Sequence, residues 1–226
     1  MRIRELKASV AALMQGTDLD QILEAVNGFP REQVLNPLFS CLCSCDEVIK
    51  WHAVTAIGQV VAGMAEADLE SARIVMRRFM WMLNDESGGI GWGVPEAIGE
   101  VCATHPQIAQ EYAHILVSFM REDGFYLELP QLQRGLMWAL ARFAQDNSQL
   151  LKEKNALVYL SPYLSSRDVY VKAHGVLASG YLRAKQFKAD IEAMAADEHL
   201  LTMYVDRRFV ETSLGALATD TLSQLQ

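Results

Sequence analysis

The chain has 226 residues, of which 51% are hydrophobic and 21% are charged, so it can bury a large core and is not disordered as a whole. Its 28 acidic and 20 basic residues give a net charge of −8, whereas nucleic-acid-binding domains usually carry a basic surface. The N-terminus lacks the apolar stretch of a signal peptide, and no window approaches roughly 18 uninterrupted apolar residues. We therefore expect a cytoplasmic protein without a membrane span, and we disfavour a nucleic-acid partner.

The first thirty residues are predicted to form two short helices, over residues 3–14 and 18–27, which do not match the pattern that follows. Terminal units of repeat proteins are often atypical, because they cover the end of an exposed core. We expect residues 1–30 to be an N-terminal cap, and residues 31–226 to be a repeat array that forms one structural domain with it.

From residue 31 onward, a similar phrase of eight residues recurs five times along the chain. Successive copies end 41, 42, 37 and 40 residues apart, always on a small residue. A small residue lets two helices cross closely, so this column is expected at helix contacts. An apolar residue precedes it in every copy and is expected to be buried. The small residues are Gly58, Gly99, Ala141, Ala178 and Ala218, and the apolar ones are Ile57, Ile98, Leu140, Leu177 and Leu217.

The stretches between these phrases supply a partner helix for each copy. Apolar side chains at steps of three and four over residues 69–83 and 107–120 follow the helical period. Suitable helix N-caps are Asp18, Asp46, Ser148 and Asp168. We find no alternating strand pattern, so the sequence predicts an all-α fold.

The runs Val54–Gly58 and Val94–Gly99, with three weaker copies, resemble HEAT and HEAT-like repeats, including the kind found in relatives of phycobilisome lyases. The resemblance covers about residues 31–222, although the acidic residue typical of the HEAT loop is matched only by Asp46 and Asp168. It implies a right-handed α-solenoid (an α-α superhelix, armadillo-like) of about five helix pairs. It also implies a binding scaffold, because HEAT arrays mostly serve in that way.

In such a stack the second helix of each pair lines the concave face. We call the side chains predicted to lie there the polar stripe, and we predict that it binds a protein or peptide partner. Its members are His52, Thr55, Gln59, Trp92, Glu96, Glu100, Trp138, Arg142 and Lys172. No catalytic residue, metal ligand or cofactor is predicted.

Two features of the stripe leave a chemical alternative open. Glu96 and Glu100 share one helix face, where they would bind a cation or act as acid and base, unless Arg142 or water neutralises them. The glycine-rich stretch 86–95 would present backbone N–H groups to an anion, but its spacing is not that of a phosphate loop. We favour the structural interpretation of both features.

Tryptophans and cysteines are also interpreted structurally. Trp51, Trp92 and Trp138 would stack a base or an organic cofactor, but in a repeat protein such residues more often pack one repeat on the next. The run from Cys41 to Cys45 lacks the spacing of a zinc site, and we expect small buried thiols there.

These observations favour a non-enzymatic interaction scaffold that binds a basic or neutral partner. One alternative is a nucleic-acid enzyme like the HEAT-like DNA glycosylases, with Trp51, Trp92, Trp138 and Glu96 around a cleft. Against it, the stripe offers few phosphate contacts beyond Arg142 and Lys172. A second alternative, drawn from the lyase relatives, is a carrier of a small molecule such as a tetrapyrrole.

Overall fold

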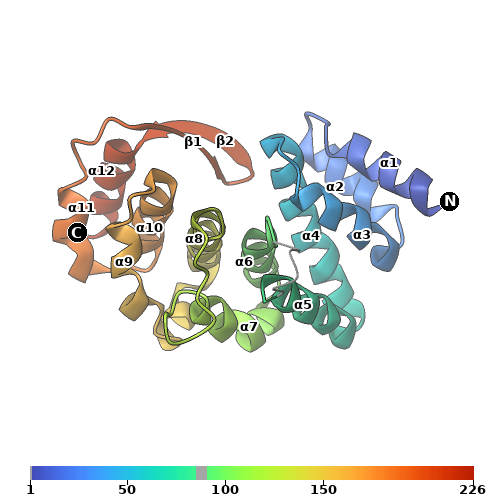
Figure 1. The fold of residues 1–226 in the computed structure, drawn as a ribbon, viewed down its shortest axis with the longest axis horizontal. Coiled ribbons are helices and arrows are strands. Elements are labelled where there is room, and N and C mark those ends of the chain that lie inside the picture. Colours follow the sequence, from blue (N-terminus) through green and yellow to red (C-terminus); the bar gives the residue numbers. More distant parts are fainter. Residues whose placement is uncertain (1, 85–90) are drawn as a thin grey trace. The chain divides into compact units, whose positions relative to one another are not determined.

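The computed structural model describes residues 2–84 and 91–226, and these form twelve α-helices, two short 3-10 helices and one pair of strands (Figure 1). The chain divides into two compact units, Met1–Ala109 and Gln110–Gln226, and the boundary lies within α7 (Pro106–Ser118). The fold is all-α apart from the strand pair, as the periodicity predicts. The domain boundary expected at residue 30 stays a prediction.

The first unit is built around one long helix. Its helices are α1 (Ile3–Leu13), α2 (Leu19–Asn27), α3 (Arg31–Leu42), α4 (Glu47–Ala67), α5 (Leu69–Leu83) and α6 (Val94–Thr104). The central helix α4 packs against α2, α3, α5 and α6, while α1 packs against α2 and α3. The two N-terminal helices therefore lie where the sequence predicts them.

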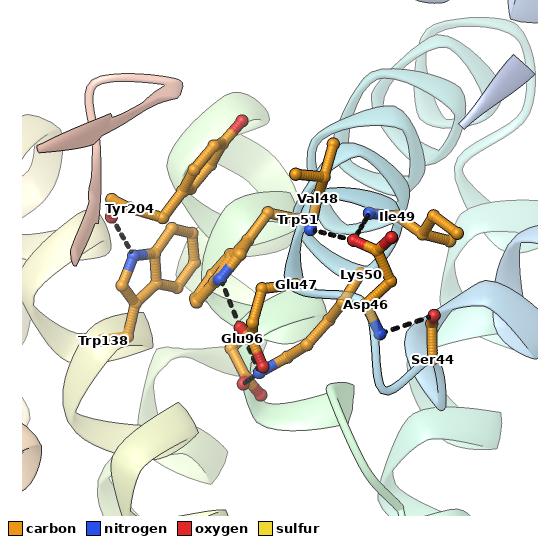
Figure 2. Close-up of polar contacts among 10 residues, drawn as sticks. All are labelled: Ser44, Asp46, Glu47, Val48, Ile49, Lys50, Trp51, Glu96, Trp138 and Tyr204. Carbon is orange, nitrogen blue, oxygen red and sulfur yellow. Dashed lines mark hydrogen bonds and ion pairs between the residues drawn. The ribbon is translucent and has the colours of Figure 1, made fainter. Parts of the chain in front are cut away.

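The start of α4 is fixed by its first residues. The Asp46 carboxylate accepts hydrogen bonds from the backbone N–H groups of Val48 (2.9 Å) and Ile49 (3.5 Å), and the Asp46 N–H donates to Ser44 Oγ (3.1 Å; Figure 2). These bonds satisfy N–H groups that have no partner inside the helix. Asp18 and Asp168 cap α2 and α10 (Val169–Tyr181) in the same way. The expected cap Ser148 follows a kink at Asn147 (φ −133°, ψ 42°), where two helical segments join to form the long helix Pro130–Glu153.

By length and composition α4 resembles a membrane span, and it is the one such helix among the residues that the structure describes. However, 67% of its most apolar window is buried inside the protein. Ala53, Val54, Ile57 and Val61 are all fully buried on it. Its apolar character is therefore used in packing, as in the core helix of a globular unit.

The second unit has one long helix followed by shorter elements. These are α8 (Pro130–Glu153), α9 (Ser161–Leu164), α10, α11 (Lys188–Glu192), β1 (Leu200–Val205), β2 (Arg208–Ser213) and α12 (Leu214–Gln224), with 3-10 turns at Ala156–Tyr159 and Lys185–Phe187. Here α10 packs against α8, α9 and α12. The helices that pair with α10 and α12 are short: α9 has 4 residues and α11 has 5, whereas α8 spans 24 residues.

The repeated small residues lie at helix contacts, as predicted. All five are buried, one each on α4, α6, α8, α10 and α12. The preceding apolar position is buried in the first three copies, but Leu177 and Leu217 are only half-buried. The last two pairs have small outer elements, which leaves less surface to cover those side chains.

A β-hairpin in the second unit corrects the expectation of no strands. Strands β1 and β2 pair antiparallel, with Tyr204 opposite Phe209 and Val205 opposite Arg208. The fifth phrase, predicted to be helical from Glu211, is in strand until α12 begins at Leu214. The pattern is hard to see, because Tyr204 is buried on the face opposite to its buried neighbour Met203, which ends the alternation.

Candidate binding surface

In the first unit, two members of the polar stripe bond to the chain's own N-terminal segment. His52 is 8% exposed, and its Nδ1 donates to the Met14 carbonyl at 2.9 Å. The Gln59 side-chain amide donates to the Leu23 carbonyl at 3.3 Å. Thr55 is buried and donates to the Trp51 carbonyl within α4. These side chains were expected on the concave face, and the sequence left open whether the N-terminal helices fill it; His52 and Gln59 in fact bond to those helices.

Glu96 forms a buried ion pair that the sequence does not indicate. Its Oε1 lies 3.0 Å from Lys50 Nζ, and the two side chains are only 4% and 13% exposed (Figure 2). Lys50 also lies 3.8 Å from Glu47 Oε2. Lys50, from the start of α4, therefore supplies the counter-charge that was expected from Arg142 or water.

Glu100, one turn further along α6, is 2% exposed and packs against α4. A Cβ built on Gly58 would lie only 2.5 Å from the Glu100 Cγ, so the glycine makes room for this side chain. The Thr104 hydroxyl of α6 also lies 3.4 Å from the Gly58 carbonyl. The small-residue column therefore places a glutamate stem in the contact between α4 and α6. The pair Glu96 and Glu100 is a buried feature and not an exposed cation site.

Trp51 lies at the start of α4, where its indole Nε1 donates to Glu47 Oε2 at 2.8 Å (Figure 2). Lys50 Nζ lies 4.7 Å from the centre of its ring, a cation–π distance. The Trp51 side chain is 7% exposed, whereas the Glu47 side chain is 57% exposed. Glu47 is thus the accessible acidic group of this cluster.

Trp92 is half-buried and lies just before α6. Gly93 follows it with φ of 73°, a left-handed conformation that suits glycine, and caps α6. A Cβ on Gly93 would also lie 3.0 Å from the Leu42 carbonyl oxygen. This end of the glycine-rich stretch therefore makes a close turn, while residues 86–90 of that stretch lie outside the described residues.

In the second unit, Trp138 on α8 is covered by the hairpin. Its Nε1 donates to the Tyr204 carbonyl at 2.6 Å, and the two rings lie 6.4 Å apart (Figure 2). Trp138 is 5% exposed and Tyr204 is 3% exposed. The Tyr204 ring also meets the edge of the Phe209 ring at 5.3 Å. A second bond joins the Gln145 side-chain amide to Asp206 Oδ1 at 2.8 Å.

The two basic members of the stripe are half-buried. Arg142, between Trp138 and the helix end, pairs with Asp146 one turn along α8. Burial raises the pKa of nearby Tyr181, and the negative charge of Asp206 raises it further. The hydrogen bond from the His199 N–H is the main cause of the lowered pKa of Asp197. The positive charge of Lys172 on α10 lowers this pKa further.

The cysteines are only partly as expected. All four are free thiols, and Cys41 and Cys102 are buried, but Cys43 and Cys45 are exposed because α3 ends at Leu42. Burial raises the pKa of Cys102 to about 12. No group of three His, Cys, Asp or Glu side chains suited to a metal ion occurs among the described residues.

Four groups that shape this surface were missed from the sequence: Lys50, Gln145, Tyr204 and Asp206. Each acts through a partner distant in the chain, from 46 residues for Lys50 to 66 for Tyr204. Helical periodicity identifies residues that share a face, but it does not identify what lies against that face.

No family model matches the chain. An uncharacterised protein of Archaeoglobus fulgidus is 30% identical over 120 residues, which are 52% of this chain and 61% of that protein. The chain therefore matches less than two thirds of that relative.

Solved structures give a likeness over nearly the whole chain. A designed armadillo repeat protein has a TM-score of 0.53 at 18% identity, covering 96% of this chain and 99% of its own. Another, in complex with the peptide (KR)4, has a TM-score of 0.55 at 17% identity, covering 96% and 98%. An engineered protein has a TM-score of 0.56 at 14% identity, covering 100% and 99%. The fold of this chain is that of a HEAT- or armadillo-like helical repeat protein.

Proposed function

We propose that the chain is a non-enzymatic scaffold that binds a protein or peptide partner. The observation that carries the proposal is the helical-repeat fold, shared over 96% of the chain with a designed protein that was solved with a bound peptide. Stacked helix pairs present extended surfaces that suit long, narrow ligands.

The contacts of the stripe support binding over catalysis. His52 is committed to a backbone carbonyl, Glu96 to Lys50, and Trp138 to the hairpin. A general base must reach a substrate proton, and a stacking tryptophan must expose its ring. Because these three groups are buried against the chain itself, they are not placed to act on a substrate.

The charge of the chain supports a basic or neutral partner. The net charge is −8, and the exposed Glu47 carboxylate, which accepts from the buried Trp51 indole, is an acidic group at the protein surface. Such a field attracts cationic segments and repels acidic ones, and added salt screens the effect.

Selection from a random library of 12-residue peptides, displayed on phage, tests the proposal. We expect enriched peptides of neutral or positive net charge with Kd values of roughly 100 μM or tighter, measured by fluorescence anisotropy with synthetic copies. A selection that enriches no peptide over an unrelated control protein would refute the scaffold function. Enrichment of acidic peptides would refute the charge preference alone.

The structure also guides the choice of variants that locate the binding surface. Replacing Glu96 or Glu100 would destabilise the first unit, since both are buried, so their loss of binding would be uninformative. The half-buried Trp92 and Lys172 are suitable for alanine substitution. Lys188→Ala, on the exposed surface of α11, is the matched control and should leave affinity unchanged.

A further inference from the structure

The inner face of α8 already binds an extended segment, namely the chain's own hairpin. Trp138 donates to the main-chain carbonyl of Tyr204 at 2.6 Å, and Gln145 donates to the side chain of Asp206 at 2.8 Å. Trp138 and Gln145 are seven residues apart, which places them on one face about 10 Å from each other. Two hydrogen-bond donors on α8 thus bind Tyr204, near the end of β1, and Asp206, in the turn that follows.

The bond from Trp138 engages the outer edge of β1. Val205 and Arg208 flank the two-residue turn and form its closing pair, so the next pair, Tyr204 and Phe209, is of the non-hydrogen-bonded kind. The carbonyl of Tyr204 therefore points away from β2, toward the Trp138 indole N–H that it accepts from. The Trp138 indole therefore recognises a main-chain group of the strand, and the Tyr204 ring packs beside the indole ring.

The tip of the hairpin is strained. Asp206 and Arg207 have φ of 50° and 62°; Asp is favoured at the first position of such a turn, but the second favours Gly, so the strain lies at Arg207. A two-stranded hairpin has marginal stability alone, so its order depends on what it packs against. Here the polar contacts to α8 offset the strain at the tip.

We propose that this α8 face is a site for an extended peptide segment, and that the β1–β2 hairpin is a built-in occupant which a partner displaces. The proposal rests on the proposed scaffold function and assigns it a site and a means of regulation. The segment that fits places an aromatic residue against Trp138 and a side-chain acceptor two positions later, as Tyr204 and Asp206 do in the hairpin. Uncharged Asn at the second position agrees with the charge of the chain.

A labelled peptide with the sequence of residues 200–206, flanked by lysines for solubility, is the probe, and anisotropy gives its affinity for the full chain. Two variants are placed on the hairpin, so that the α8 face stays intact in them. Asp206→Ala removes the acceptor for Gln145, and Arg207→Gly relieves the strained φ at the tip. Trp138→Phe removes the donor from the site itself.

We expect Asp206→Ala to bind the peptide about two- to tenfold more tightly than wild type, because one hydrogen bond of the occupant is lost. Arg207→Gly should bind about two- to fivefold more weakly, because its hairpin is a better competitor. Trp138→Phe should lose binding. A control peptide with alanine at the positions of Tyr204 and Asp206 should not bind.

Trypsin gives a direct measure of displacement, because Arg207 and Arg208 lie at the exposed hairpin tip. Bound peptide should speed cleavage at these two bonds relative to other sites in the chain. Equal affinity of both hairpin variants and wild type, or no binding by Asp206→Ala, would overturn the proposal. The proposal would also be overturned if a peptide from the library bound wild type and all hairpin variants with equal affinity. That result would leave the proposed scaffold function intact.

Discussion

Removal of Lys50 from its buried pair with Glu96 should destabilise the first unit more than the loss of any surface ion pair. The two charged atoms lie 3.0 Å apart, with side chains 13% and 4% exposed. Lys50→Met keeps the apolar stem but leaves the Glu96 carboxylate without this cation. Breaking a buried pair from one side costs about 3–5 kcal/mol. The double variant Lys50→Met/Glu96→Gln removes both charges and should recover much of that loss.

The measurement is a double-mutant cycle from urea unfolding followed by circular dichroism. We expect a coupling free energy of about 1.5–3 kcal/mol between Lys50 and Glu96. The matched control is Lys188 and Glu192 on α11, a pair 3.9 Å apart with side chains 51% and 55% exposed, for which about 0.5 kcal/mol is expected. High salt should reduce the coupling between Lys188 and Glu192 far more than the coupling between Lys50 and Glu96. Equal couplings for the two pairs would refute the buried-pair argument.

Three further predictions concern thiols and a glycine. Cys43 and Cys45 should react rapidly with a thiol reagent in the native state, while the buried thiols should react only after unfolding; rapid reaction of all four would contradict the burial. Burial raises the pKa of Cys102 to about 12, above its unfolded value near 9, so its contribution to stability is complete below about pH 9 and is lost as pH rises toward 12. Urea unfolding of Cys102→Ala between pH 8 and 10.5 should show a weaker decline with pH than wild type, and the exposed-site variant Cys43→Ala should show none of this change. Gly215→Ala should lower stability by about 1–3 kcal/mol, because its Cβ would lie 2.6 Å from the Ala195 carbonyl oxygen, while Gly175→Ala, where the nearest atom is 3.3 Å away, should change thermal unfolding little.

The helix pairs could be predicted because their signal is local and repeated. A small residue and its apolar neighbour mark the same helix contact five times, so weak copies gain support from strong ones. The hairpin gave no comparable signal. Its turn is Asp206-Arg207, not Asn-Gly, and only Leu201 and Met203 show the alternation of a strand.

The binding role of the polar stripe stays a prediction, but the structure shows what covers several of its members. Periodicity places His52 and Gln59 on one face of α4, yet the backbone of α1 and α2 lies against that face. The counter-charge for Glu96 likewise comes from Lys50, 46 positions earlier in the chain. Sequence spacing reports neighbours within one helix, whereas these contacts depend on how separate helices pack.

Within the first unit the N-terminal helices cover stripe residues, and within the second unit the hairpin does; the two segments are held in different ways. The N-terminal cover is part of the core, since Val10, Met14 and Val26 are at most 1% exposed, and removing it would unfold the first unit. The hairpin bonds to α8 through Trp138 and Gln145 and buries Leu201, Met203 and Tyr204 of β1 to 2–3% exposure, but its tip is exposed and Arg207 has a strained φ. In both places a stripe side chain donates to a main-chain carbonyl, of Met14 or of Tyr204, so the inner helices are equipped to bind backbone. Because the hairpin adds an exposed and strained tip to that chemistry, we propose it as the cover that a partner displaces, and the search for a partner should therefore begin at Trp138.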